Sequence, residues 1–334
     1  MSTDYCCFDA SDEHLHTPGP QPAWNESMAF AAIEGNGPSL FIRHGRRYNE
    51  GHIEVSVAQL GPDGSLDVAF AKRPLDRNSI GNGRTSSGGG LTFSLIEPAK
   101  RWRATYAGQI RRIPHYNDFA ANPGAALKAA PAIDCTFALE FEDRGPLFGT
   151  GPNGSIPGGE RYLSGRHYES TVHCVGAISM GNTKRDVSTY GFRDHSWGVR
   201  DMTRVEFTRW FWAQIDAKTS CVGWFTRSDG QLHSSGIILR NGSVEVATRA
   251  KLASTYNTGP DRYARCARLE LDSTSGDIVL EIETGGALPL RYENEGRTTR
   301  GLEFAARVKG SDWPAWAEYW DQMIDGAPIG NSVA

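Results

Sequence analysis

The feature that most constrains this chain is the alternation of apolar and polar residues along its length. Residues 53–57, 137–142 and 278–283 each place an apolar side chain at every second position. Successive side chains of a β-strand point to opposite faces, so this pattern indicates half-buried antiparallel strands. Turn sequences separate such runs, and Asn241-Gly242 is the strongest hairpin signal among them. The sequence therefore predicts an all-β fold of the barrel or sandwich kind.

Helical signals are few. The segment Ala120–Ala130 is predicted to form one short helix, which Pro123 interrupts. The segment Trp313–Met323 is predicted to form a C-terminal helix, because its tryptophans recur at helical spacing. We expect this helix to cover the end of a barrel.

The 334 residues are enough for two domains. Residues 1–22 are polar and rich in proline near their end, which indicates an arm without regular structure. The longest turn-rich stretch is Arg144–Gly159, the best candidate for a linker or long loop. We therefore expect an N-terminal β domain over residues 23–165 and a C-terminal β domain over residues 166–334.

Composition excludes several classes of function. The formal net charge is -4 and no basic stripe is visible, which disfavours nucleic-acid binding. No long apolar run suggests a membrane span, and the first residues do not resemble a signal peptide, so we expect a cytoplasmic protein. A homodimer stays open, because the sequence does not define the oligomeric state. The six cysteines form no C-x-x-C pair, no metal-ligand spacing surrounds Asp194, His195 and Glu169, and we interpret His14 and His16 as solvated. We expect neither a metal nor a cofactor.

Chemically active side chains are densest in the segment Tyr190–Asp201. It holds two acids, a histidine, two arginines and a tryptophan. Two further polar and aromatic clusters, Arg166–Glu169 and Trp210–Trp212, lie nearby in the sequence. We expect the three clusters to meet across one pocket.

The candidate acid–base residues come from these clusters. Adjacent strand residues face opposite sides, so one of Asp194 and His195 can point inward while the other braces the loop. A carboxyl among indole rings is poorly solvated, and its pKa rises toward neutrality, where it can donate a proton. We predict Asp194 and His195 as the acid–base pair, with Glu169 as a second candidate. The alternative for Arg193 is a structural one, in which it holds a turn through carboxylate pairs.

Aromatic and polar neighbours complete the predicted pocket. The residues expected to contact substrate are Tyr168, Tyr190, Arg193, Trp197, Trp210 and Trp212. The tyrosines would hydrogen-bond a substrate oxygen, and Arg193 would orient Asp194 or neutralise an anionic group. Tryptophan faces can stabilise a developing cation, although core packing is the simpler role for them. On a strand, Trp210 and Trp212 share one face and Phe211 takes the other.

The segment Gly191–Asp201, read as G-F-R-D-H-S-W-G-V-R-D, resembles a signature of bacterial proteins related to hydroxyneurosporene synthase, the carotenoid 1,2-hydratase, and to the AttH-like proteins. His167-Tyr168-Glu169 is similar to the H-Y-E-Q segment of that family, with Ser170 in place of glutamine. Ser196 stands where the hydratase itself has asparagine.

The N-terminal part of the chain supports the same resemblance. The segments Trp24–Ser27 and Arg43–Gly51 are similar to the start of the family's N-terminal domain. The resemblance implies two lipocalin-like, calycin-type β-barrels packed together around an apolar pocket. It also implies cofactor-independent chemistry on a hydrophobic small molecule.

Two reactions remain open at this point. One is hydration of an isoprenoid alkene, and the other is lyase cleavage of an aromatic, lignin-like side chain. The alternatives are a pericyclic cyclase and a non-catalytic carrier of a hydrophobic ligand. Fold alone does not choose among them.

Overall fold

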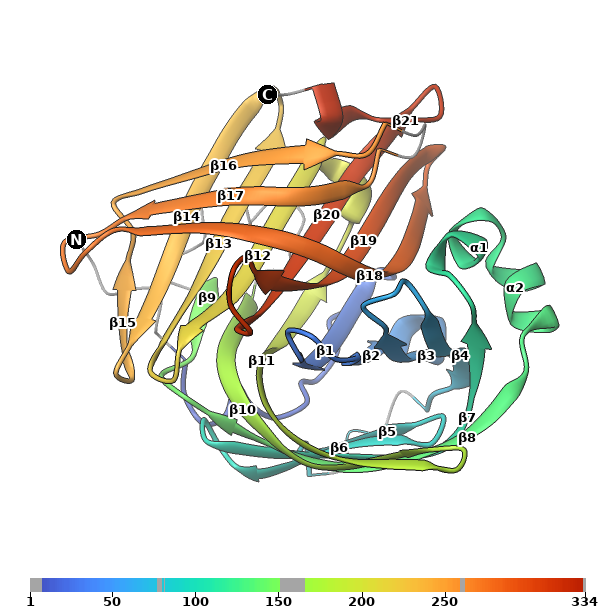
Figure 1. Ribbon diagram of the computed structural model, residues 1–334. Helices are drawn as coiled ribbons and strands as arrows, with labels where there is room; N and C mark the ends of the chain where they lie inside the picture. Colours follow the sequence, from blue (N-terminus) through green and yellow to red (C-terminus); the bar gives the residue numbers. More distant parts are fainter. Residues whose placement is uncertain (1–7, 77–79, 81, 151–165, 259–261, 333–334) are drawn as a thin grey trace.

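The computed structural model describes residues 8–76, 80, 82–150, 166–258 and 262–332. Nearly all regular elements are β-strands, and they form two large antiparallel sheets (Figure 1). The predicted all-β fold with two barrel-like units and few helices is confirmed.

The first sheet contains β1 (Trp24–Ala32), β2 (Ser39–Arg47), β3 (His52–Leu60), β4 (Leu66–Pro74), β5 (Thr85–Gly88), β6 (Leu91–Glu97), β7 (Arg101–Ile113), β8 (Ala132–Asp143), β9 (Phe148–Thr150), β10 (Arg166–Met180) and β11 (Thr183–Val199). Its strand order is β4-β3-β2-β1-β11-β10-β8-β7-β6-β5, and β9 pairs with β10. Because β4 also pairs with β7, the strands from β4 to β7 in this order close into a ring. Apolar side chains such as Phe30, Phe93 and Phe141 fill its interior.

The second sheet contains β12 (Phe207–Asp216), β13 (Thr219–Ser228), β14 (Gln231–Arg240), β15 (Ser243–Val246), β16 (Arg249–Tyr256), β17 (Ala264–Asp272), β18 (Ile278–Asn294), β19 (Arg297–Val308), β20 (Pro314–Ile324) and β21 (Ala327–Pro328). Its order is β15-β14-β13-β12-β20-β19-β18-β17-β16, with β21 on β20. Asn241 and Gly242 join β14 to β15 with φ of 51° and 78°. Two positive φ angles are what a tight hairpin turn requires, so the predicted hairpin is confirmed.

The chain changes sheets between Val199 and Phe207, through the short η4 helix (Met202–Arg204). The sequence placed the domain boundary earlier, between residues 165 and 166. In the structure β10 and β11 lie after that boundary but pair with β8 and β1, and so belong to the first sheet. Residues 151–159 of the expected linker lie outside the described residues.

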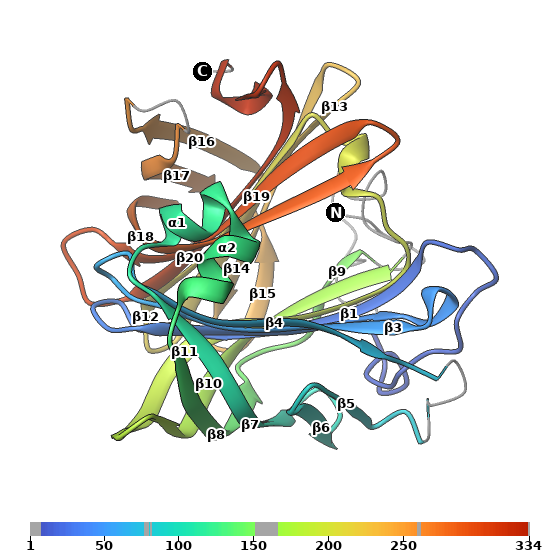
Figure 2. The same cartoon turned by 90° about the vertical axis from the view of Figure 1, so that its right-hand side faces the viewer.

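A shared apolar layer joins the two sheets, which stack against each other (Figure 2). Trp210 and Trp212 of β12 contribute to this layer, whereas Phe211 packs inside the second sheet. The predicted division of these three residues between two faces is confirmed. Each buried tryptophan removes on the order of 200 Å² from water, so the layer is a large part of what holds the sheets together.

The predicted C-terminal helix is wrong, because Trp313–Met323 forms most of strand β20. Trp316 packs in the layer between the sheets, while Ala315, Ala317 and Tyr319 pack inside the second sheet. Both faces of β20 are therefore apolar, which hides the alternation of a half-buried strand.

Two short helices lie beside the sheets, α1 (Tyr116–Ala121) and α2 (Pro123–Ala129) (Figure 2). Asn122 separates them and caps α2 by accepting a hydrogen bond from the Ala125 backbone N–H at 3.0 Å. The prediction of a short helix interrupted near Pro123 is confirmed. The remaining short helices are η2 (Tyr48–Glu50) and η5 (Ile329–Ser332). Among the described residues, no helix has the length and apolar character needed to cross a membrane.

Candidate active site

Strand β11 divides the predicted cluster between two faces of the first sheet. Asp194 lines a cavity toward the second sheet, whereas His195 hydrogen-bonds to Glu26 on the other side. Because adjacent strand residues alternate, the two side chains cannot act as one acid–base pair. The predicted Asp194–His195 pair is therefore not assembled.

A small cavity of about 50 Å³ lies between the sheets. The first sheet contributes His167, Glu169 and Asp194 to its wall, and the second contributes Trp210, Trp224 and Glu318. The register explains this convergence, because Glu169 lies opposite Asp194 and Trp210 lies opposite both Trp224 and Glu318. With Trp320, the cavity is thus lined by three carboxyl groups and three indoles.

Glu169 is the most deeply buried acid of this cavity, with 4% of its surface exposed. Its Oε1 lies 2.8 Å from His167 Nε2, and its Oε2 accepts a hydrogen bond from Trp210 Nε1 at 3.1 Å. Burial raises the pKa of Glu169 to about 8, although hydrogen bonds from Trp210 and Trp224 oppose the rise. Burial also lowers the pKa of His167 to about 4. On these pKa values Glu169 keeps its proton at neutral pH and His167 is uncharged.

Asp194 is the second acid on the first sheet. Burial raises its pKa to about 6, while the charges of His167 and Arg200 oppose the rise. Asp194 is partly exposed, whereas Glu169 is buried, and both line the cavity. Two carboxyls of different pKa thus face the same space.

The second sheet adds a pair of coupled acids, Glu303 on β19 and Glu318 on β20, which lie opposite each other. Burial raises the pKa of Glu303 to about 7. Burial and the neighbouring charge of Glu303 together raise the pKa of Glu318 well above its ordinary value. Trp316 Nε1 donates to Glu303 at 3.0 Å and Trp320 Nε1 to Glu318 at 3.1 Å. This pair shares a proton, because like charges so close cannot both ionise readily.

Sequence reasoning missed Glu303, Glu318 and His167 as site residues. For Glu318 the usable signal was the spacing of two between Trp316, Glu318 and Trp320, which places them on one face of a strand. The assignment of this segment to a helix concealed that signal.

A much larger pocket of about 930 Å³ adjoins the cavity, and Arg200 and Met202 line both. Its wall includes apolar residues from both sheets and from the helices, such as Phe41, Phe119 and Leu290. A small organic molecule typically occupies a pocket of 300–1,000 Å³. The large pocket can therefore hold a substrate, and the small cavity next to it carries the acids.

Three buried side chains of the first sheet carry hydrogen-bonding atoms without a partner among the described residues. These atoms are His167 Nδ1, Ser196 Oγ and the amide atoms of Asn25. His167 lines the cavity, whereas Ser196 and Asn25 do not. Buried polar atoms are normally paired, so His167 Nδ1 can bind a polar atom of a substrate or water.

On the opposite face of β11, Arg193 makes a buried ion-pair network. Its Nη1 lies 2.9 Å from Glu13 Oε1, and its Nη2 lies 2.7 Å from Asp143 Oδ2. The structural alternative for Arg193 therefore describes its contacts better than a role beside Asp194. Glu13 belongs to the N-terminal arm, whose described part packs against the barrel at Glu13 and Leu15. The arm's polar sequence gave no signal of this contact.

Tyr168, His195 and Trp197 lie on this same face. Tyr168 Oη lies 3.1 Å from His195 Nδ1, and the Trp197 ring stacks on His16 with centroids 3.9 Å apart. Neither Tyr168 nor Trp197 lines the cavity between the sheets. The two clusters on β10 and β11 thus divide between the two faces of this strand pair, and Trp210 of the third cluster joins Glu169 and Asp194 on the face toward the second sheet.

Two predicted residues contact other parts of the protein. Tyr190 packs near Trp313, with ring centroids 6.0 Å apart. Trp212 Nε1 donates to Thr171 Oγ1 at 3.1 Å in the layer between the sheets. Of the predicted site residues, the structure brings together Glu169, Asp194 and Trp210.

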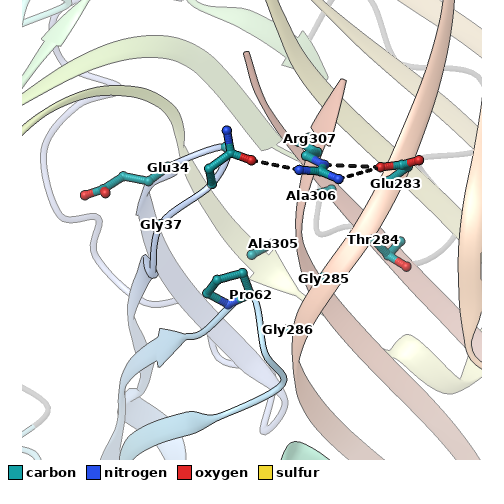
Figure 3. A pocket seen from close by; sticks show the side chains of 12 residues that line it. Glu34, Gly37, Pro62, Glu283, Thr284, Gly285, Gly286, Ala305, Ala306 and Arg307 are labelled. Atoms are coloured by element: carbon teal, nitrogen blue, oxygen red, sulfur yellow. Dashed lines mark hydrogen bonds and ion pairs between the residues drawn. The ribbon is translucent and has the colours of Figure 1, made fainter. Parts of the chain in front are cut away.

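Another pocket, of about 290 Å³, lies where loops of the first sheet approach β18 and β19 (Figure 3). Arg307 hydrogen-bonds to Asn36 of the first sheet's loops at 2.8 Å. It also hydrogen-bonds to Glu283, its register partner on β18, at 3.0 Å (Figure 3). Backbone packs closely here, since a Cβ on Gly286 would lie 2.3 Å from the Gly61 carbonyl oxygen. We interpret this pocket as a joint between the sheets, because its charged groups bind each other.

Fold and site together define a protein of two stacked antiparallel β-sheets with protonatable carboxyl groups buried between them. The chain belongs to the family described as domain of unknown function DUF7064, whose model matches residues 9–320. No curated protein sequence is significantly similar to it.

Solved structures share the fold over nearly the whole chain. A protein assigned as an AttH from Nitrosomonas europaea is 12% identical, with 98% of this chain and 99% of that chain covered and a TM-score of 0.60. Kievitone hydratase from Nectria haematococca is 12% identical, with 92% of each chain covered and a TM-score of 0.53. CghA is 13% identical, with 91% of this chain and 90% of that chain covered and a TM-score of 0.51. The expected AttH-like fold is supported, and the relation to the carotenoid hydratase stays a prediction.

Proposed function

We propose that this protein is an enzyme of the hydratase or lyase type that acts on a hydrophobic small molecule by general acid–base catalysis. The observation that carries the proposal is the cavity between the sheets, where Glu169, an acid of raised pKa, lies opposite Asp194. A carboxyl that keeps its proton near neutral pH can protonate an alkene or a carbonyl group. A solved structure named as a hydratase shares the fold, which agrees with this proposal.

The substrate would bind in the adjoining pocket of about 930 Å³. Phe41, Phe119 and Leu127 offer apolar contacts, while Arg43 and Arg200 offer positive charge for a polar end. Its reactive carbon would approach the acids past Arg200 and Met202, which line both spaces. A hydrophobic molecule with one polar group therefore suits the pocket.

For an alkene, the reaction would use two carboxyls in turn. Glu169 gives its proton to one alkene carbon, and a carbocation forms at the other. Water adds to that cation, and Asp194 accepts the proton which the bound water loses. The faces of Trp210 and Trp224 stabilise the cation while it exists. The sum is addition of one water, after which proton exchange restores both acids.

The same groups could run a lyase reaction. Asp194 would remove a proton from a hydroxyl group, a bond would break, and a small carbonyl fragment would leave as Glu169 protonates the remainder. A non-catalytic carrier fits the site less well, because a carrier has no need for buried acids. Here the inner end of the pocket meets Asp194, Glu169 and Glu318.

Turnover by the wild type and Glu169→Gln tests the proposal. Each would be incubated with isoprenoid alkenes and prenylated phenols in water labelled with oxygen-18. Mass spectrometry would then measure product formation and incorporation of the label. We expect the variant to lose roughly 10²–10⁴-fold in turnover while ligand affinity is kept. Glu142→Gln, an exposed position on β8, is the matched control. Equal turnover by Glu169→Gln and wild type would contradict the assignment of the acid.

A further inference from the structure

A cluster of metal-ligating side chains lies on the face of β11 opposite the acid cavity. His16 Nδ1 is 2.8 Å from Glu26 Oε1, and His195 Nε2 is 3.0 Å from the same oxygen. The three ligand atoms lie within 4.8 Å of one another. Two imidazole nitrogens and one carboxylate form a donor set that binds zinc and other first-row divalent metals in proteins.

Three separate segments build this cluster. His16 comes from the N-terminal arm, Glu26 from β1, and His195 from β11. Glu26 and His195 are buried, with 0% and 1% of their surfaces exposed. The sequence separations are too long for any ligand motif, which explains why sequence reasoning predicted no metal.

Tyr168 lies behind His195. The Tyr168 hydroxyl is 3.1 Å from His195 Nδ1, the ring nitrogen that does not face Glu26, and it accepts a hydrogen bond from Arg193 Nη1 at 3.4 Å. The phenol oxygen can therefore accept a hydrogen from Nδ1.

The other ring nitrogen, His195 Nε2, faces Glu26 Oε1 at 3.0 Å. When a metal ion binds Nε2, the hydrogen of the neutral ring lies on Nδ1 and is donated to the Tyr168 oxygen. A histidine whose second N–H is held by an outer partner in this way is the usual form of a metal ligand.

We propose that His16, Glu26 and His195 bind one divalent transition-metal ion of the zinc type, with Tyr168 as the outer partner of His195. Ligand atoms around a tetrahedral zinc, with bonds of about 2.1 Å, lie roughly 3.4 Å apart. The distances from Glu26 Oε1 to the two nitrogens are 2.8 and 3.0 Å, so a small outward shift accommodates the ion.

The position of His16 determines how a metal ion would enter the site and which segments it would hold together. Its side chain is 23% exposed, so an ion can reach the site from the surface. The ion would clip the N-terminal arm to β1 and β11. It would lie behind Asp194 and apart from the acid cavity, so the proposal is independent of the proposed reaction.

Metal binding by the full chain tests this site. Chelator-treated protein would be titrated with Zn²⁺ by calorimetry and with Co²⁺ by visible absorption, and thermal unfolding would be followed with and without Zn²⁺. We expect one ion per chain, a higher unfolding temperature with zinc, and a cobalt spectrum of nitrogen and oxygen ligation. His16→Ala should abolish binding, and Tyr168→Phe should weaken it roughly 10–100-fold.

Two further variants keep the test decisive. His233→Ala, on β14 of the second sheet, should bind as the wild type does. Glu26→Gln preserves size and should also abolish binding, which guards against misfolding of His16→Ala; circular dichroism would check both. The proposal is overturned if no ion binds, if folded His16→Ala and Glu26→Gln bind as wild type, or if the cobalt spectrum shows thiolate ligation.

Discussion

Replacing Glu169 with glutamine should change how the stability of this protein depends on pH. The side chain is buried at the wall of the acid cavity, and burial raises its pKa to about 8 from an ordinary value of 4.5. Between these values the unfolded chain releases a proton that the folded protein keeps. The folded protein thus binds more protons, and its stability falls as pH rises through this window.

The size of the effect follows from the same two values. Each pH unit in the window removes about 1.4 kcal/mol from the wild type relative to Glu169→Gln, whose amide does not titrate. Between pH 5 and pH 8 the free energy of unfolding of the wild type should fall by about 4 kcal/mol relative to the variant. Below pH 4.5 both states of the wild type are protonated, and the difference should level off.

Urea unfolding at pH 5, 6, 7 and 8 measures this difference. The wild type and Glu169→Gln would be followed by tryptophan fluorescence, with Glu142→Gln as a control for loss of one negative charge on an exposed strand position. Parallel curves for the wild type and Glu169→Gln across the whole range would refute the reasoning. They would mean that Glu169 is ionised in the folded protein.

Three other substitutions have defined outcomes. Arg193→Met leaves two buried carboxylates without their cation, so urea unfolding should show a loss of about 3–5 kcal/mol. Trp210→Phe keeps a ring in place but removes the N–H donated to Glu169, so the pKa of Glu169 should rise further and the fall in stability should extend to higher pH. Glu303→Gln removes the charge that, after burial, most raises the pKa of Glu318, so infrared titration should show Glu318 ionising at lower pH.

Much of the fold could be predicted because half-buried strands show an alternation of apolar and polar residues over a few positions. Alternation over residues 53–57, 137–142 and 278–283 falls within β3, β8 and β18, and Asn241-Gly242 forms the hairpin that its sequence requires. The prediction of a helix over Trp313–Met323 was wrong because apolar residues pack on both faces of β20, which hides the alternation of a strand. The helical spacing of the tryptophans then favoured a helix.

The candidate site was predictable only in part. Alternation within β11 required that Asp194 and His195 face opposite sides, and that rule should have separated them into two sites. Residues brought from far away, such as Glu318 on the second sheet and Glu13 and His16 on the arm, leave no local pattern beside their partners. Their roles depend on how the sheets stack and where the arm packs, which short-range periodicity does not encode.

Infrared spectroscopy tests the central claim most directly, because a protonated carboxyl and a carboxylate absorb at different frequencies. The wild type and Glu169→Gln would be compared at pH 7 in a difference spectrum. We predict a carbonyl stretch of a protonated acid in the wild type that is missing from the variant and disappears above about pH 8. A difference spectrum at pH 7 with only carboxylate bands would contradict the account, because Glu169 could not then be the proton donor.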